Sequence, residues 1–414
     1  MLDLDATVAR AGLGLACDPP PDLRVALLGM RCEASTYAAQ LLGVVLPDAE
    51  ELMRSAPPGS IPWAQSVLAY IEGMLMAGRI DDLLAAAASL REVEPVPEAV
   101  GRMALGYVAT ILILDAIGRI PDGNVLAERF EVVVRAAGER EPIAQFWWHV
   151  MFAMRSAYAY EDPWNGREHG GAIRAIFDAI GGERVFMNMQ MWRSVNLCYL
   201  GELEEAERAL SAIPAADESL GVASSNRRFH LAWLLADRGV LDEARALATQ
   251  LAEYGHAHQL SLEEGRGRWG LAEVLRRSGD LDAADREVQV ALAMAAPLER
   301  TGVLGTLAAL RLAQGRPAEA LAVAEEAVAG IAAMGGCGLF RGAFVRLAHA
   351  EALHATGALD AARAAIGEAR ARLLAIVDRI PAGEPRQRFL EQIPENARTV
   401  ALARAWLGEA GPSA

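Results

Sequence analysis

Small and apolar residues recur at fixed positions around a repeated glycine in the second half of the chain. The repeated segments are Gly201–Ala206, Gly239–Ala244, Gly279–Ala284, Gly315–Ala320 and Gly357–Ala362. A small residue stands seven positions before each glycine: Ser194, Ala232, Ala272, Ala308 and Ala350. The residue four positions before each glycine is leucine in four repeats and arginine in one: Leu197, Leu235, Leu275, Arg311 and Leu353. The glycines are 38, 40, 36 and 42 residues apart, and a period of this size predicts helical-hairpin repeats.

Each position in the repeat has a physical interpretation. The glycine is predicted to end one helix in a conformation that other side chains resist. The acidic residues that follow in most copies, such as Asp242 and Glu243, belong to the first turn of the next helix, where they complement its dipole. The alanine five residues after the glycine indicates that the two helices of a hairpin approach closely. The pattern therefore predicts an all-α protein, a right-handed α-solenoid of tetratricopeptide-like hairpins with a period of about 40 residues.

The same spacing organises the rest of the chain. Gly78 and Gly118 are 40 residues apart, although Ile71 and Ile111 replace the small residue there. We expect a helix pair within 22–54, broken near Pro47, and a loop insertion over 158–166. The predicted divisions are 1–56, an N-terminal lead-in and helix pair; 57–185, divergent helical repeats; 186–380, tetratricopeptide-like repeats; and 381–414, C-terminal capping helices and tail.

Two stretches resemble known families. The repeats are longer than 34 residues and resemble the helical regions of maltose-regulator-like proteins. Residues 386–399, followed by 401–407, resemble the close of large myxobacterial serine/threonine kinases, in which a kinase domain and a P-loop ATPase precede a tetratricopeptide region. The kinase motifs His-Arg-Asp and Asp-Phe-Gly are absent from this sequence, as is a Walker A motif. The resemblance therefore implies a helical sensor or scaffold without the enzyme activity.

The net charge and the absence of lysine exclude several classes of partner and of chemistry. The chain has 39 basic and 54 acidic residues and a net charge of −15, which disfavours nucleic-acid binding. Lysine is absent from the sequence, which excludes a P-loop lysine and a Schiff-base amine.

The sequence also disfavours an export signal, a membrane-spanning helix and disulfide bonds. The acidic start Met-Leu-Asp-Leu-Asp is unlike an export signal. The apolar run 103–118 carries Asp115 and is predicted to be a buried helix rather than a membrane span. The four cysteines lack paired spacing, so we expect apolar fillers in a reducing, cytoplasmic compartment: Cys17, Cys32, Cys198 and Cys337.

Histidine spacing does not predict a metal site. His349 and His354 are five residues apart and diverge on a helix, whereas a zinc-binding helix places them four apart. His256 and His258 fall at a predicted helix end, where a solvated turn is the simpler interpretation. We expect no metal and no cofactor.

The candidate binding residues lie on the first helix of each hairpin, which lines the concave groove in tetratricopeptide arrays. The glycine register places these candidates there: Asn188, Met191, Asn226, Phe229, Trp233, Asp237, Arg266, Trp269, Glu273, Arg276, Phe344, Glu351 and His354. Aromatic and arginine side chains are typical anchors for protein partners. For Phe229, Trp233 and Trp269 the alternative is packing between neighbouring hairpins.

These observations predict a non-catalytic scaffold or regulatory module that binds a protein or peptide in its groove. The partner is expected within a signalling assembly and could be its kinase or ATPase component. The alternative is a sensor of a small molecule or signal peptide that uses the same aromatic-lined groove.

Overall fold

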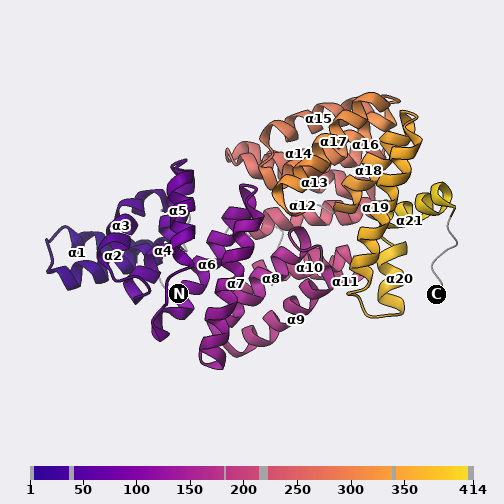
Figure 1. The fold of residues 1–414 in the computed structure, drawn as a ribbon. Helices are drawn as coiled ribbons and strands as arrows, with labels where there is room; N and C mark the ends of the chain where they lie inside the picture. Colours follow the sequence, from indigo (N-terminus) through magenta and orange to yellow (C-terminus); the bar gives the residue numbers. More distant parts are fainter. Residues whose placement is uncertain (1–3, 37–41, 181–182, 214–221, 338–341, 409–414) are drawn as a thin grey trace. The chain divides into compact units, whose positions relative to one another are not determined.

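The structure of the chain is a computed structural model that describes residues 4–36, 42–180, 183–213, 222–337 and 342–408. Every secondary-structure element in these ranges is a helix (Figure 1). The residues form two compact units, one of 1–115 with 119–151 and one of 116–118 with 152–414. The all-α expectation is confirmed.

The helices at the start of the first unit, up to residue 90, pack as successive neighbours. Its helices are α1 (Leu4–Leu15), α2 (Pro21–Thr36), α3 (Leu42–Ser55), α4 (Ile61–Met76), α5 (Ile80–Leu90), α6 (Val100–Ala116), α7 (Ile120–Ala137) and the beginning of α8 (Pro142–Tyr158). Short 3-10 turns, Pro97–Ala99 and Gly138–Arg140, precede α6 and α8. Gly78 and Gly118 have φ angles of 68° and 82°, so the glycine turn of the repeats also joins α4 to α5 and α6 to α7.

The second unit contains the regular hairpins. Its helices are α9 (Pro163–Ile180), α10 (Glu183–Tyr199), α11 (Leu203–Ser211), α12 (Val222–Asp237), α13 (Leu241–Ala257), α14 (Ser261–Arg277), α15 (Leu281–Met294), α16 (Pro297–Ala313), α17 (Pro317–Met334), α18 (Gly342–Ala355), α19 (Leu359–Val377), α20 (Glu384–Glu391) and α21 (Pro394–Leu407). From α10 to α19 they form five hairpins, each with its predicted glycine in the turn.

The turn glycines adopt the predicted left-handed conformation. All five have φ between 70° and 84°. In each turn the N–H of the residue after the glycine donates to the carbonyl oxygen five residues earlier, at 2.8 to 3.0 Å. Val240 N–H, for example, donates to Leu235 O at 2.8 Å. This bond satisfies a carbonyl that the end of the first helix would otherwise leave unpaired.

The small residues of the repeat are completely enclosed. The five alanines after the glycines are each 0% exposed: Ala206, Ala244, Ala284, Ala320 and Ala362. The small residues before the glycines are at most 1% exposed: Ser194, Ala232, Ala272, Ala308 and Ala350. The close approach of the two helices in each hairpin is therefore confirmed.

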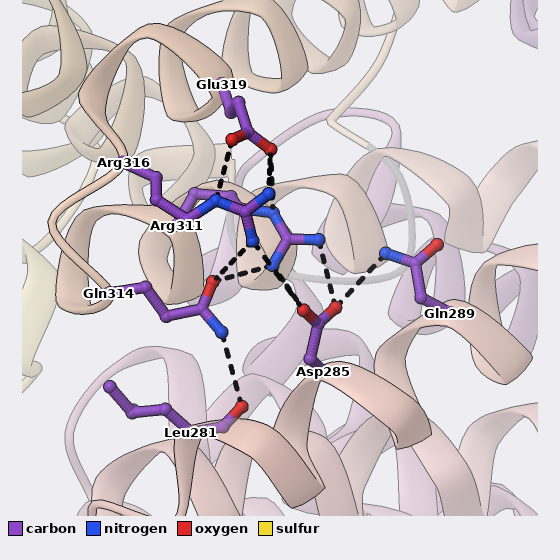
Figure 2. Close-up of polar contacts among 7 residues, drawn as sticks. All are labelled: Leu281, Asp285, Gln289, Arg311, Gln314, Arg316 and Glu319. Atoms are coloured by element: carbon purple, nitrogen blue, oxygen red, sulfur yellow. Dashed lines mark hydrogen bonds and ion pairs between the residues drawn. The ribbon is translucent and has the colours of Figure 1, made fainter.

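Arg311, the one departure from leucine in the register, has charged partners (Figure 2). Its Nη1 and Nη2 atoms donate to the two carboxylate oxygens of Asp285, at 2.6 and 3.0 Å, and Nη1 also donates to Gln314 at 2.6 Å. These hydrogen bonds help to lower the pKa of the Asp285 carboxyl group below its usual value. A bidentate pair between α15 and α16 thus takes the place of the leucine contact.

The first helices of the hairpins form the tighter layer of the second unit. Consecutive first helices α10, α12, α14, α16 and α18 each contact the next one. The second helices contact chiefly their own first helix and the first helix of the following hairpin. A stack that is closer on one side curves toward that side, so the first helices line its inner face.

Two local expectations are wrong. Pro47 lies inside α3 and does not break a helix pair at that point. The predicted loop over 158–166 is much shorter, because α8 ends at Tyr158 and α9 begins at Pro163. Proline is well suited to that first position, since its fixed φ fits the helix and its missing N–H needs no partner there.

One described stretch, Pro97–Ala116, has the length and composition to cross a membrane, and 61% of its apolar window is buried inside the structure. Burial of this kind is ordinary for the core helix of a folded domain. Asp115, near its end, is 0% exposed.

Two glycines on α14 test the packing of the hairpins. A Cβ atom at Gly267 would lie 2.3 Å from the backbone nitrogen of Ala252 on α13. At Gly270 the nearest atom would be the Cβ of Ala248, at an ordinary 3.5 Å. We expect Gly267→Ala to lower the free energy of unfolding by about 1–3 kcal/mol through overpacking. Gly270→Ala should be neutral or stabilising by up to about 1 kcal/mol, because alanine favours helix.

Urea unfolding followed by circular dichroism measures both variants. Equal behaviour of the two would contradict the close backbone approach of α13 and α14.

Candidate functional site on the first helices of the C-terminal repeats

Three of the predicted aromatic residues form one buried cluster. Phe229 and Trp233 lie on α12, and their rings are each 5.4 Å from the ring of Trp269 on α14. Their exposed fractions are 1%, 5% and 1%. Trp269 Nε1 donates to Thr306 Oγ1 on α16 at 2.9 Å, which ties a third helix to the cluster. The burial agrees with the packing alternative for these rings, and their use in binding stays a prediction.

Arg266 connects three first helices through polar contacts. Its Nη1 donates to Asn226 Oδ1 on α12 at 2.7 Å, and its Nε donates to Glu299 Oε1 on α16 at 2.8 Å. Glu299 is 4% exposed, whereas the Arg266 side chain is 15% exposed. The predicted residues Asn226 and Arg266 are therefore brought together, and Glu299 is a partner that the sequence analysis missed.

Glu273 is the centre of a second charged group. Its Oε1 atom accepts from Arg276 Nη2 at 2.6 Å and from Arg277 Nε at 2.6 Å, and Arg277 also donates to Asp237 at 2.9 Å. Burial alone raises the pKa of the Glu273 carboxyl group, but the charges of the two arginines outweigh it and hold the pKa at about 2. The carboxylate is therefore ionised at neutral pH, and Arg277 is the member of this group that the sequence analysis did not identify.

The remaining candidates lie at the two ends of the array. Met191 on α10 is buried, at 1% exposed, and the side chain of Asn188 is outside the part described. On α18, Glu351 pairs with Arg398 at 3.0 Å. His354 stacks on Trp406, with the ring centres 4.4 Å apart.

Phe344 on α18 is half-buried. Arg398 and Trp406 both belong to α21, so that helix covers the side of α18 that carries Glu351 and His354.

The start and the end of the second unit are also in contact. Glu161, between α8 and α9, is 8% exposed and pairs with Arg346 on α18 and with Arg372 Nε on α19 at 2.6 Å. Arg379 Nη2 donates to the Glu161 carbonyl oxygen at 2.9 Å. The array therefore curves far enough for its ends to meet. No local sequence pattern predicts these contacts, because the partners are separated by 185 to 218 residues.

The junction leaves a small pocket of about 40 Å³, lined mainly by apolar groups from both ends of the unit: residues of α8 to α10 on one side and of α18 to α21 on the other. Such a space holds a water molecule or two and is far below the size of a ligand pocket, roughly 300–1,000 Å³. Cys337 lines it, and burial, chiefly, raises the pKa of its thiol. This cysteine is not an activated nucleophile.

Within the described ranges, no group of three or more His, Cys, Asp or Glu residues is placed to hold a metal ion. His256 Nδ1 lies 3.3 Å from Glu264, and His258 Nδ1 contacts the Tyr254 carbonyl oxygen at 2.9 Å. Burial lowers the pKa of His149 to about 4. Burial, followed by the charge of Arg266, lowers that of His230 to about 3. Both histidines are neutral at pH 7.

Comparison with known proteins places the fold. No protein-family model matches the chain, and no curated protein matches its sequence. A Rap protein solved with competence and sporulation factor has a TM-score of 0.54 at 12% identity, over 83% of this chain and 97% of that one. The Cut9 subunit of the Cut9–Hcn1 complex gives 0.46 at 12% identity, over 94% and 76%. The chain has a tetratricopeptide-like helical-repeat fold.

The charge on Glu273 makes the stability of the array depend on pH. Its pKa rises from about 2 when folded toward the ordinary 4.5 when unfolded, so the stabilisation is complete above pH 4.5 and is lost as pH falls toward 2. We expect Glu273→Gln to lower the free energy of unfolding at pH 7 by about 3–5 kcal/mol, because buried arginine charge loses its partner.

The difference from the parent should shrink as pH approaches 2, whereas the exposed control Glu253→Gln should match the parent throughout. Thermal melts at a series of pH values measure this. A difference that stays constant from pH 7 to pH 2 would argue against the assigned charge.

The aromatic cluster provides a test of packing. Trp269→Ala should cost about 3–5 kcal/mol, because it leaves a cavity among α12, α14 and α16. Leu262→Ala, at a 40% exposed side chain of the same helix, should cost much less. Chemical unfolding compares them. Parent-like stability of Trp269→Ala would show that the ring does not hold these helices together.

Proposed function

We propose that this protein is a non-catalytic scaffold that binds a peptide or an extended segment of a partner protein along the inner helices of its C-terminal repeats. The proposal takes the partly exposed candidates Arg266 and Arg276 as the contact surface of that site, and the buried candidates as the residues that hold them in place. It rests on the row of polar groups that crosses α12, α14 and α16.

The observation that carries the proposal is the periodicity of that row. Asn226 bonds to Arg266, and Asp237 bonds to Arg277; each pair is separated by 40 residues, one repeat. Equivalent positions of successive helices thus place polar groups side by side. Packed helices lie about 8–10 Å apart, and an extended chain advances about 3.3 Å per residue. A linear peptide that crosses the helices therefore advances by about three residues from one helix to the next. The accessible groups of the row are the arginines of α14, because Asn226 is 7% exposed and the Asp237 side chain 4%.

The arginines in the row determine how a partner is recognised. Arg266 and Arg276 remain partly exposed, at 15% and 21% of their side chains, while their carboxylate partners Glu299 and Glu273 are almost fully buried. An acidic or carbonyl-rich segment can share the exposed N–H groups without separating the buried pairs. Binding of this kind weakens as salt concentration rises.

A bound factor in a protein of this fold supports a binding role. The Rap protein that shares this fold was solved with a factor bound. The junction pocket of about 40 Å³ is too small for most metabolites, so the small-molecule alternative would need another hollow, such as the one of about 460 Å³ beside α16 and α17. We place the protein in the cytoplasm, where cysteines such as Cys32 and Cys337 stay reduced. A signalling assembly with a kinase or ATPase component is the setting that we propose.

Arg276→Gln tests the proposal with a matched control. Arg300→Gln makes the same change of charge on α16, at an exposed pair with Glu326 on α17. We expect the Arg276 variant to retain its helicity and to bind the partner about tenfold more weakly, equivalent to about 1.4 kcal/mol. The Arg300 variant should bind like the parent.

The measurement is capture from native lysate with quantitative mass spectrometry at low and at high salt. A partner retained equally by all three proteins would move the site away from the inner helices.

A further inference from the structure

The first unit contains a groove that the candidate residues do not include. It has a volume of about 220 Å³ and is formed by the N-terminal halves of α4 and α6, the start of α8 and one residue of α2. The apolar wall is made by Leu68, Leu105, Ile143 and Trp147. A space of this size accommodates one or two side chains of a partner rather than a whole ligand.

Two glycines of α6 account for the shape of the groove. A Cβ atom at Gly106 would lie 2.6 Å from Val67 Cγ1, so α6 approaches α4 closely at that level. Five residues earlier, a Cβ atom at Gly101 would meet the Glu141 carboxylate at 3.1 Å and Ile143 at 3.7 Å. The absence of a side chain at Gly101 lets the start of α8 approach α6 and keeps the groove open to Glu141.

The charge in the groove is unbalanced. Glu33 accepts from Gln65 at 2.5 Å and from Arg102 at 3.1 Å, so the charge of Arg102 is already compensated. Among the described residues, neither Glu98 nor Glu141 has an ion-pair partner. The inner helices of the second unit differ in this respect, because their glutamates Glu273 and Glu299 are each paired with arginine.

The helix dipole explains only part of this arrangement. Glu98 precedes α6 and Glu141 precedes α8, where negative charge is favourable for any helix. The dipole gives no reason for an apolar wall beside them. Ile143 is 49% exposed, and Leu105 and Trp147 are only half-buried.

We propose that this groove docks a peptide segment in which arginine or lysine side chains alternate with large apolar ones. The two unpaired carboxylates attract the basic groups, and the net charge of −15 favours the approach of a cationic segment. Trp147 lines the same groove as Glu141, and a cation over an indole face is attracted to it. Leu68, Leu105 and Ile143 receive the apolar side chain. This site is separate from the inner helices of the second unit and goes beyond the function proposed for them.

The test uses two labelled synthetic peptides of 12 residues. One contains leucine and arginine, and the other contains glutamate in place of every arginine. Fluorescence anisotropy with the full-length protein should show binding of the arginine peptide only. Glu98→Gln with Glu141→Gln should weaken that binding about three- to tenfold, and more at low salt than at high salt.

Matched variants separate the groove from the general charge of the protein. Glu128→Gln removes an exposed carboxylate of α7 outside the groove and should change binding by less than about twofold. Ile143→Ser should weaken binding, whereas Val132→Ser, at a side chain of α7 that is 56% exposed, should leave it unchanged.

Equal binding of the acidic peptide, or equal loss with Glu128→Gln and with the groove variants, would overturn the proposal. Circular dichroism melts confirm that each variant is folded, since all of the substituted side chains are at least partly exposed. A failure here leaves the Arg276 experiment unaffected, because that experiment concerns a different unit and a different partner.

Discussion

The left-handed glycine at the end of each first helix is the constraint on which the C-terminal repeats depend. Other residues pay about 1–2 kcal/mol to adopt this conformation. The turn lets the next N–H group bond back to the last turn of the helix, and it reverses the chain within a few residues. The alanine five residues later then meets the preceding helix with no exposed surface. Glycine and alanine thus act together, one setting the direction of the chain and the other the distance between helices.

The leucine position of the repeat can hold a charged residue where polar partners replace the apolar contact of the leucine. Arg311 stands where four other repeats have leucine. Its guanidinium group donates hydrogen bonds to Asp285 and Gln314 and forms an ion pair with Glu319. A buried arginine without these acceptors would be strongly unfavourable. The replacement of leucine by arginine therefore depends on two hairpins, since Asp285 belongs to α15 in one and Arg311 to α16 in the next.

Sequence reasoning predicted what local periodicity determines. The helical class, the glycine turns and the enclosed alanines all follow from spacing within about one repeat. Burial of Trp233 and Trp269 was left open, because a helix face alone does not say how closely the next helix approaches. Contacts of Glu161 with α18 and α19 were missed, because they join segments far apart in the sequence. Arg277 was missed although it lies one repeat after Asp237, a spacing that could have identified it.

The groove of the first unit was missed for a different reason: Ile143 and Trp147 belong to α8, a helix that no copy of the glycine repeat follows.

The distribution of charge distinguishes charged residues that stabilise the fold from charged residues that a partner can contact. In the second unit the carboxylates of Glu161 and Glu273 each hold two arginines, and Glu161 does so with a φ of 48°, which is unfavourable for a residue with a side chain. Removing such groups disturbs folding before it disturbs recognition, because each joins two or three segments of the chain.

Recognition at low structural cost requires side chains whose own hydrogen bonds or ion pairs are incomplete. The exposed edges of Arg266 and Arg276 meet that requirement in the second unit, and the carboxylates of Glu98 and Glu141 meet it in the first. The two proposed surfaces therefore differ in charge preference: the one in the second unit favours an acidic segment, and the one in the first unit favours a basic segment.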